Sequence, residues 1–116
     1  MKYEEELVGD IRIVRIKEKK LTCEEAPEMK TQFLKLLTEE GEELVISLKD
    51  VEYMDSTGLG SFLFGIRQAE RYDKDLVICE VSSRIQSLIK IAHLDSVLEI
   101  FKTEKEAVQA LQEDEI

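Results

Sequence analysis

Residues 44–48 constrain the fold more than any other part of the chain. They read Leu-Val-Ile-Ser-Leu, a nearly continuous apolar run that suits a strand covered on both faces, as in a parallel sheet. Farther along, apolar residues recur at helical spacing over residues 59–69, which leaves Arg67 and Arg71 facing water. A buried strand followed by an amphipathic helix predicts an α/β domain with a strand-to-helix junction between the two segments.

Strand and helix patterns alternate along the chain after an opening hairpin. Gly9-Asp10 has Gly at the first central position of a two-residue turn, which suits a type II′ hairpin. Apart from the helix over 59–69, the predicted helices begin at Pro27 or at the Ser/Thr-x-x-Glu/Gln patterns that start at Ser83 and Thr103. In order, we expect a hairpin over 4–17, a helix from Pro27 to near Gly41, the strand 44–48 and the helix 59–69, a strand over 76–81, a helix over 83–92, a short strand or extended segment over 95–101, and a last helix after Thr103.

This order predicts an α/β fold with one mixed sheet of four to five strands, mostly parallel, and about four helices packed on it. In the strand after the hairpin turn, Ile13 falls on one face and Val14 on the other, so both faces of that strand are expected to be covered. A length of 116 residues is ordinary for one core, and we expect a single domain over residues 1–116.

Asp55 and Ser56 occupy the strand-to-helix junction. Both are good N-cap residues, because their side-chain oxygens accept hydrogen bonds from free amides of the first helical turn. In one interpretation, which residue types alone favour, Ser56 only caps the helix. In the other, its hydroxyl is exposed and accepts a phosphate from another enzyme.

The charge of the chain argues against two kinds of partner. With a formal net charge of -10 and a pI near 4.6, its field repels nucleic acid and anionic membranes, so a basic or mixed protein surface is the expected partner. Cys23 and Cys79 form no CxxC motif, which argues against a zinc or redox site. The sequence has no apolar leader segment and no run of membrane-spanning length. Together these features predict a cytoplasmic protein.

Catalytic and ligand-binding patterns fail in three ways. Leu63 stands where a GxGxxG fingerprint beginning at Gly58 requires a glycine. His93 is the only histidine and lies near a predicted helix end, so Ser56 has no evident general base. Acidic runs such as residues 4–6 are typical of solvated surface and lack calcium-loop spacing. We therefore expect no enzymatic activity, no cofactor and no metal site.

Residues 53–60, Tyr-Met-Asp-Ser-Thr-Gly-Leu-Gly, resemble the signature of bacterial anti-sigma factor antagonists, which are members of the STAS domain family. An Asp, two small hydroxyl residues and two glycines in this order after an apolar strand carry the resemblance, and Ala26-Pro27 at the head of the first helix supports it. The resemblance implies the STAS fold. It also implies that Ser56 is the phosphorylated residue, with Thr57 as the second choice.

The partners follow from the same resemblance. An anti-sigma factor with serine kinase activity binds ATP and phosphorylates the antagonist, and a PP2C-type phosphatase removes the phosphate. In this partner switching, which regulates transcription, the unphosphorylated form binds the anti-sigma factor and releases the sigma factor, while phosphorylation at Ser56 blocks binding. The alternative is a non-switching STAS scaffold or small-ligand-binding module in a larger regulatory complex, in which Ser56 is only a cap.

Partner contacts are expected around the serine, where small residues let another backbone approach closely. Gly58 suits packing and partner contact equally, whereas for Gly60 we favour tight helix–sheet packing. One loop departs from the better-known members, which have a Gly-x-hydrophobic-Asp turn where residues 19–22 read Lys-Lys-Leu-Thr. Since that loop lies near the serine in the family, the departure bears on partner contacts. The predicted partner-binding residues are Asp55, Ser56, Thr57, Gly58, Gly60 and Ser61.

Overall fold

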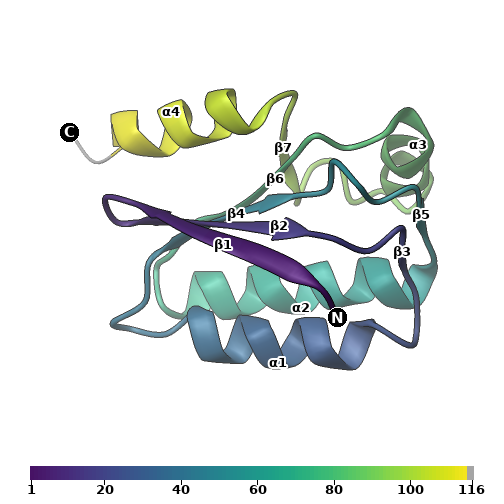
Figure 1. Cartoon of the computed structure of the whole chain (residues 1–116), viewed down its shortest axis with the longest axis horizontal. Helices are drawn as coiled ribbons and strands as arrows, with labels where there is room; N and C mark the ends of the chain where they lie inside the picture. The colour runs from purple at the N-terminus through teal and green to yellow at the C-terminus, as the bar shows by residue number, and fades with distance from the viewer. Residues whose placement is uncertain (115–116) are drawn as a thin grey trace.

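A mixed five-stranded sheet crosses the molecule, with helices on both of its faces (Figure 1). The structure is a computed structural model that describes residues 1–114. β1 pairs antiparallel with β2, and the other neighbouring strands pair in parallel, which confirms the predicted mixed α/β sheet. In spatial order, the strands are β1 (Tyr3–Val8), β2 (Ile11–Ile16), β4 (Glu43–Ser47), β6 (Leu76–Cys79) and β7 (Glu99–Phe101).

The N-terminal hairpin forms as the sequence predicts. Its two-residue turn is Gly9-Asp10, and Gly9 has a φ of +61°. Glycine adopts this left-handed region without steric cost, and the first central position of a type II′ turn requires it. In β2, Ile13 belongs to the hydrophobic cluster on one face of the sheet and Val14 to the cluster on the other, so both faces are covered.

Two helices lie side by side on one face of the sheet. They are α1 (Ala26–Leu36) and α2 (Ser56–Arg71), both below the sheet in Figure 1. Where they meet, the rings of Phe33 and Phe62 pack edge to face with their centroids 5.7 Å apart. The larger hydrophobic cluster fills the space between these two helices and the sheet.

The other two helices lie elsewhere. α4 (Glu104–Asp114) packs on the opposite face over β4 and β6 and buries Ala107 (Figure 1). α3 (Ser83–Ile91) lies at one end of the sheet, on the right in Figure 1. In β4, Val45 faces the cluster under α4, whereas Ile46 faces the cluster over α1 and α2. The strand is therefore buried on both faces, as its apolar run predicts.

A second, two-stranded sheet joins the segment before α1 to the segment before α2. β3 (Lys20–Leu21) pairs in parallel with β5 (Tyr53–Met54), at the right-hand end of Figure 1. The amides of Glu52 and Tyr53 both donate to the carbonyl of Lys19. The sequence did not predict this pairing, because each strand is too short to show periodicity. It brings residues 19–22 against residues 53–60.

The end of α1 differs from its prediction. The helix ends at Leu36, well before Gly41, because the backbone of the C-cap residue Leu37 leaves the helical region, with φ of -95° and ψ of 86°. The chain then turns toward β4, and the amide of Gly41 donates to the carbonyl of Thr38. Gly41 does not adopt the left-handed conformation expected of a helix C-cap glycine. Gly41 therefore does not mark the end of the helix.

The two C-terminal helices are capped by side chains. At α3 the cap is Ser82, whose Oγ accepts from the amide of Ile85 at 3.2 Å, so the helix begins at Ser83 and the capping-box pattern of Ser83 and Gln86 places the cap one residue late. At α4, Oγ1 of Thr103 accepts from the amide of Glu106 at 3.1 Å, as predicted. Each cap satisfies one amide that the first helical turn leaves unpaired.

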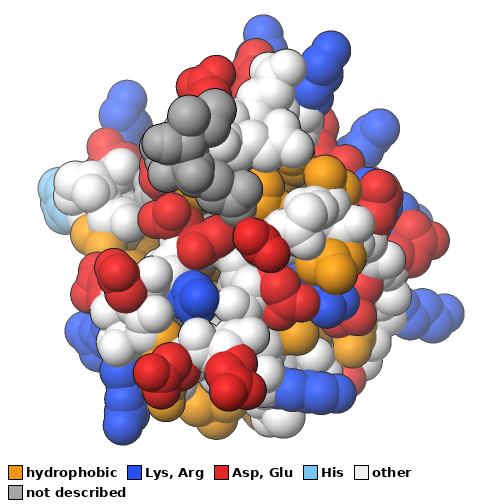
Figure 2. All heavy atoms as spheres, turned by 90° about the vertical axis from the view of Figure 1, so that its left-hand side faces the viewer, with side chains coloured by type: hydrophobic (Ala, Val, Ile, Leu, Met, Phe, Trp, Pro, Cys, Tyr) orange, Lys and Arg blue, Asp and Glu red, His pale blue; other side chains and the backbone are white. Residues whose placement is uncertain are grey.

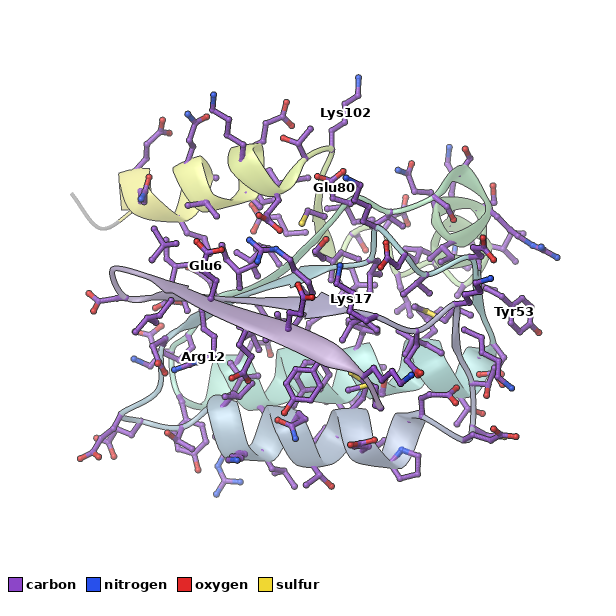
Figure 3. The ribbon with its side chains drawn as sticks, viewed as in Figure 1. Glu6, Arg12, Lys17, Tyr53, Glu80 and Lys102 are labelled. Carbon is purple, nitrogen blue, oxygen red and sulfur yellow. The ribbon has the colours of Figure 1, made fainter. Side chains whose placement is uncertain are left out.

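An ion pair ties α4 to the sheet. Arg15 on β2 donates from Nε and Nη2 to the two carboxylate oxygens of Glu104 at 2.8 and 2.9 Å, and from Nη2 to Glu6 on β1 at 2.8 Å. Figure 3 shows Glu6 on the side of β1 that faces α4. The hydrogen bond from Arg15 lowers the pKa of Glu104 below its ordinary value of 4.5. Because the pKa of Glu104 is lower in the folded state than in the unfolded state, the ion pair contributes fully to stability above the unfolded-state pKa. Its contribution is lost as the pH falls through the folded-state pKa.

Glu104→Gln is expected to lower the free energy of unfolding near neutral pH by up to about 1 kcal/mol, the usual limit for a partly exposed ion pair. The gap between wild type and variant should shrink as the pH falls below 4.5, since the wild-type carboxylate then loses its charge. Urea unfolding across a pH series measures both effects. Glu39→Gln removes an exposed carboxylate that forms no ion pair within residues 1–114 and should show no such gap. A gap that stays constant with pH would contradict this role for Glu104.

Candidate functional site

Asp55 caps α2 and ties it to the loop before α1. Its backbone is extended, with φ of -100° and ψ of -179°, and its Oδ1 accepts from the amide of Gly58 at 2.8 Å. Its Oδ2 accepts from the amide of Cys23 at 3.3 Å. One carboxylate thus connects two segments that are distant in the sequence. The interpretation of Ser56 as the cap is wrong, because Asp55 occupies the N-cap position.

Ser56 and Thr57 are the first two residues of α2, and both side chains are exposed. Within residues 1–114, neither hydroxyl has a hydrogen-bond partner. Their amides likewise have no acceptor in the described part of the chain, as is usual for the first amides of a helix. An anion attached to Ser56 would meet free N–H groups and the positive end of the helix dipole.

The two glycines of residues 53–60 play different roles. Gly58 is buried, and a Cβ there would lie 2.2 Å from the carbonyl oxygen of Leu21, so the chain tolerates no side chain at this position without moving. Gly60 is exposed, and a Cβ there would meet no heavy atom within 4 Å. Packing is therefore the role of Gly58, and the prediction of tight packing at Gly60 is wrong.

Burial removes two residues from the predicted partner-binding set. Ser61 is 0% exposed, and its hydroxyl donates to the carbonyl of Gly58, so it packs inside the molecule. This burial argues against direct contact of Ser61 and Gly58 with a partner, and the predicted set as a whole stays a prediction. The predicted residues that a partner can reach are Asp55, Ser56, Thr57 and Gly60.

Residues 19–22 lie directly against the site. The carbonyl of Leu21 accepts from the amide of Asp55 at 3.3 Å. The carboxylate of Glu25 accepts from the amide of Thr22 at 2.8 Å and from its hydroxyl at 3.0 Å, and these bonds hold the pKa of Glu25 below its usual range. The β3–β5 pairing and the Thr22–Glu25 contacts therefore fix this loop against the site.

A groove adjoins the site on the side of α3. Asp55, Tyr53 and Ile91 are among the residues that line it. The guanidinium of Arg84 lies 5.6 Å from the centre of the Tyr53 ring. The sequence analysis predicted Asp55 but missed Arg84 and Ile91, because it treated the helix that holds them only as a packing element. The sequence does contain one pattern that could have identified them: residues 83–91 include basic but no acidic side chains, although the chain as a whole is strongly acidic.

The site lacks the groups that would activate Ser56 as a nucleophile within the described residues. The hydroxyl of Ser56 has no general base bonded to it in the described part of the chain. Burial raises the pKa of the Cys79 thiol to about 12, so that thiol stays protonated near neutral pH. His93 is exposed just beyond the end of α3.

Residues 1–114 contain no group of three or more His, Cys, Asp or Glu side chains placed to hold a metal ion. None of the helices described is both long enough and apolar enough to cross a membrane.

Comparison with known proteins gives matches over most of the chain. The family model for the STAS domain matches residues 3–107. An anti-sigma-B factor antagonist from Listeria monocytogenes is 36% identical over 81 residues, which cover 70% of this chain and 71% of the relative. An anti-sigma-factor antagonist (STAS) domain protein from Planctomyces limnophilus has a TM-score of 0.84 at 18% identity, covering 95% of this chain and 97% of that one. The phosphorylated form of the Bacillus cell fate determinant SpoIIAA has a TM-score of 0.72 at 16% identity, covering 95% and 99%. Both solved structures share the fold of this chain.

Proposed function

The chain belongs to the STAS domain family, and we propose that it is an anti-sigma factor antagonist whose unphosphorylated form binds an anti-sigma factor and thereby releases a sigma factor. Phosphorylation of Ser56 blocks this binding. The names of its relatives support the function, and they describe regulatory proteins rather than enzymes. The observation that carries the switch is the exposed Ser56 hydroxyl at the first position of α2, where Asp55 leaves it free of any capping role.

The other components of the switch act on this chain from outside. The anti-sigma factor is itself a serine kinase and binds the ATP, so the chain needs no cofactor of its own. A PP2C-type phosphatase returns the chain to its binding-competent form. We place this activity in one domain over residues 1–116, acting in the cytoplasm. The lack of a nucleotide fingerprint in the sequence supports the assignment of ATP to the partner.

Phosphate on Ser56 changes the surface without reorganising the fold. It adds about -1.5 to -2 charges and three acceptor oxygens next to the free amides of Ser56 and Thr57, which tolerate an anion. The carboxylate of Asp55, held by its two hydrogen bonds, stays beside the new charge. A partner that docks on Asp55, Thr57 and Gly60 then meets a bulky, strongly negative group. Steric exclusion and repulsion of any partner carboxylate both weaken docking.

Incubation with the cognate kinase and ATP is expected to place one phosphate on Ser56, because its hydroxyl is exposed and unpaired. Mass spectrometry of peptides locates the phosphate. Ser56→Ala should abolish the modification, whereas Thr57→Ala, which removes the neighbouring exposed hydroxyl, should retain it. The competing function, a non-switching scaffold or ligand-binding module, predicts an unmodified Ser56. Absence of phosphate from both Ser56 and Thr57 would therefore support the competing function and contradict the proposed switch.

A further inference from the structure

Helix α3 is a basic element on an acidic protein. Its residues 83–91 include Arg84 and Lys90 and no Asp or Glu, although the whole chain has a formal net charge of -10. Within residues 1–114, neither of these two side chains forms an ion pair. An exposed cation without a partner is available to a carboxylate from another molecule.

The groove beside α3 is mostly apolar and open to solvent. Its volume is about 320 Å³, and it lies between β5 and α3. Tyr53, whose side chain points out from that end of the molecule in Figure 3, is 45% exposed, and Ile91 is 76% exposed. Exposed large apolar side chains around one hollow are typical of an interaction site. The groove is lined by Tyr53, Met54, Asp55, Arg84, Ile85, Ser87, Leu88 and Ile91.

The two features meet at Arg84. Its guanidinium stacks over the ring of Tyr53, with 5.6 Å between the guanidinium carbon and the ring centre. Such stacking holds a long side chain in place, so less rotamer entropy is lost when it binds a carboxylate. The groove therefore combines an apolar lining with a positioned cation, a pairing that suits a segment with an apolar side chain next to an acidic one.

The rest of the molecule is charged differently. Figure 2 shows many carboxylate side chains on the end of the molecule opposite α3, where Asp10 and Glu42 line a hollow. A basic partner surface fits that end, whereas an acidic one fits only where unpaired cations lie. Arg84 is one such cation, and it lies beside an exposed apolar hollow, which favours the groove as the place for an acidic, apolar partner segment.

We infer that the groove between β5 and α3 receives an acidic, apolar segment of the anti-sigma factor, with the partner's apolar side chain against Tyr53 and Ile91 and its carboxylate on Arg84. This inference rests on the proposed function and adds the chemistry of the contact. It also links the groove to the switch, because Asp55 lines the groove and Ser56 follows it. A phosphate on Ser56 repels the same carboxylate that Arg84 attracts.

Two substitutions test the groove in the full chain. Ile91→Ser and Arg84→Ala should each weaken binding of the purified cognate anti-sigma factor about tenfold or more, as central contacts of an interface do. Arg84→Ala should also reduce the dependence of affinity on salt concentration, since it removes a charge pair. Leu34→Ser, at a 52% exposed leucine on α1, and Arg67→Ala, at an exposed arginine on α2, are the matched controls and should bind as wild type does. Isothermal titration measures all five proteins.

The outcomes separate the two proposals. If wild type does not bind the anti-sigma factor, the proposed function fails. If wild type binds and phosphate on Ser56 abolishes binding, yet both groove variants bind like the controls, the function stands and the groove inference is overturned. A second copy of the chain is the other conceivable occupant. Sedimentation of wild type as a dimer that Ile91→Ser dissociates would overturn the inference in favour of self-association.

Discussion

Gly58→Ala is expected to lower the free energy of unfolding by at least about 2 kcal/mol, within the range found when atoms are forced into a packed interior. An added Cβ would lie 2.2 Å from the carbonyl oxygen of Leu21 and 2.9 Å from its carbonyl carbon. This carbonyl accepts from the amide of Asp55 at 3.3 Å. The backbone therefore cannot retreat from position 58 without loosening the contact between the loop before α1 and the start of α2.

Gly60→Ala is the matched control, and it should have the opposite effect. The same atom is added two residues later in the same helix, but here it meets nothing within 4 Å. Alanine loses less backbone entropy than glycine when a helix forms, so the variant should be more stable by roughly 0.5 to 1 kcal/mol. Urea unfolding of both variants against wild type gives the two differences. Equal destabilisation by the two substitutions would contradict the packing role of Gly58.

Local sequence patterns predicted most of the fold. The apolar run at residues 44–48 reflects burial of β4 on two faces, and the helical spacing of α2 reflects a single buried face. The hairpin turn at Gly9-Asp10 was predictable because a positive φ at the first turn position favours glycine. In each case the residues that carry the signal are also those that form the element, so the signal is present in a short window of sequence.

Contacts between distant segments account for what the sequence did not predict. The β3–β5 pairing and the hydrogen bond from the Cys23 amide to Asp55 join segments about thirty residues apart, and no periodicity marks them. The choice between Asp55 and Ser56 as cap depends on which residue has the extended backbone. Likewise, the roles of Gly58 and Gly60 depend on where the Leu21 carbonyl lies. Residue type alone contains none of this information.

The central claim is that a phosphate on Ser56 decides whether the chain binds its anti-sigma factor. Phosphorylation is expected to weaken that binding at least about a hundredfold, which corresponds to a loss of roughly 3 kcal/mol. The loss follows from a large anion at an exposed position beside the fixed carboxylate of Asp55, on the proposed docking surface. Ser56→Ala should bind as wild type does, since Asp55 rather than Ser56 caps the helix. Ser56→Asp should mimic the phosphate only weakly, because one carboxylate has less charge and shorter reach.

Titration of the purified anti-sigma factor with unmodified protein and with protein stoichiometrically phosphorylated on Ser56 is the most direct test. Ser56→Ala protein carried through the same treatment with kinase and ATP controls for phosphate elsewhere and for effects of the treatment. The expected result is tight binding of the unmodified and Ser56→Ala proteins and binding at least about a hundredfold weaker for the phosphorylated form. Equal affinity of the phosphorylated and unmodified proteins would contradict the proposed switch.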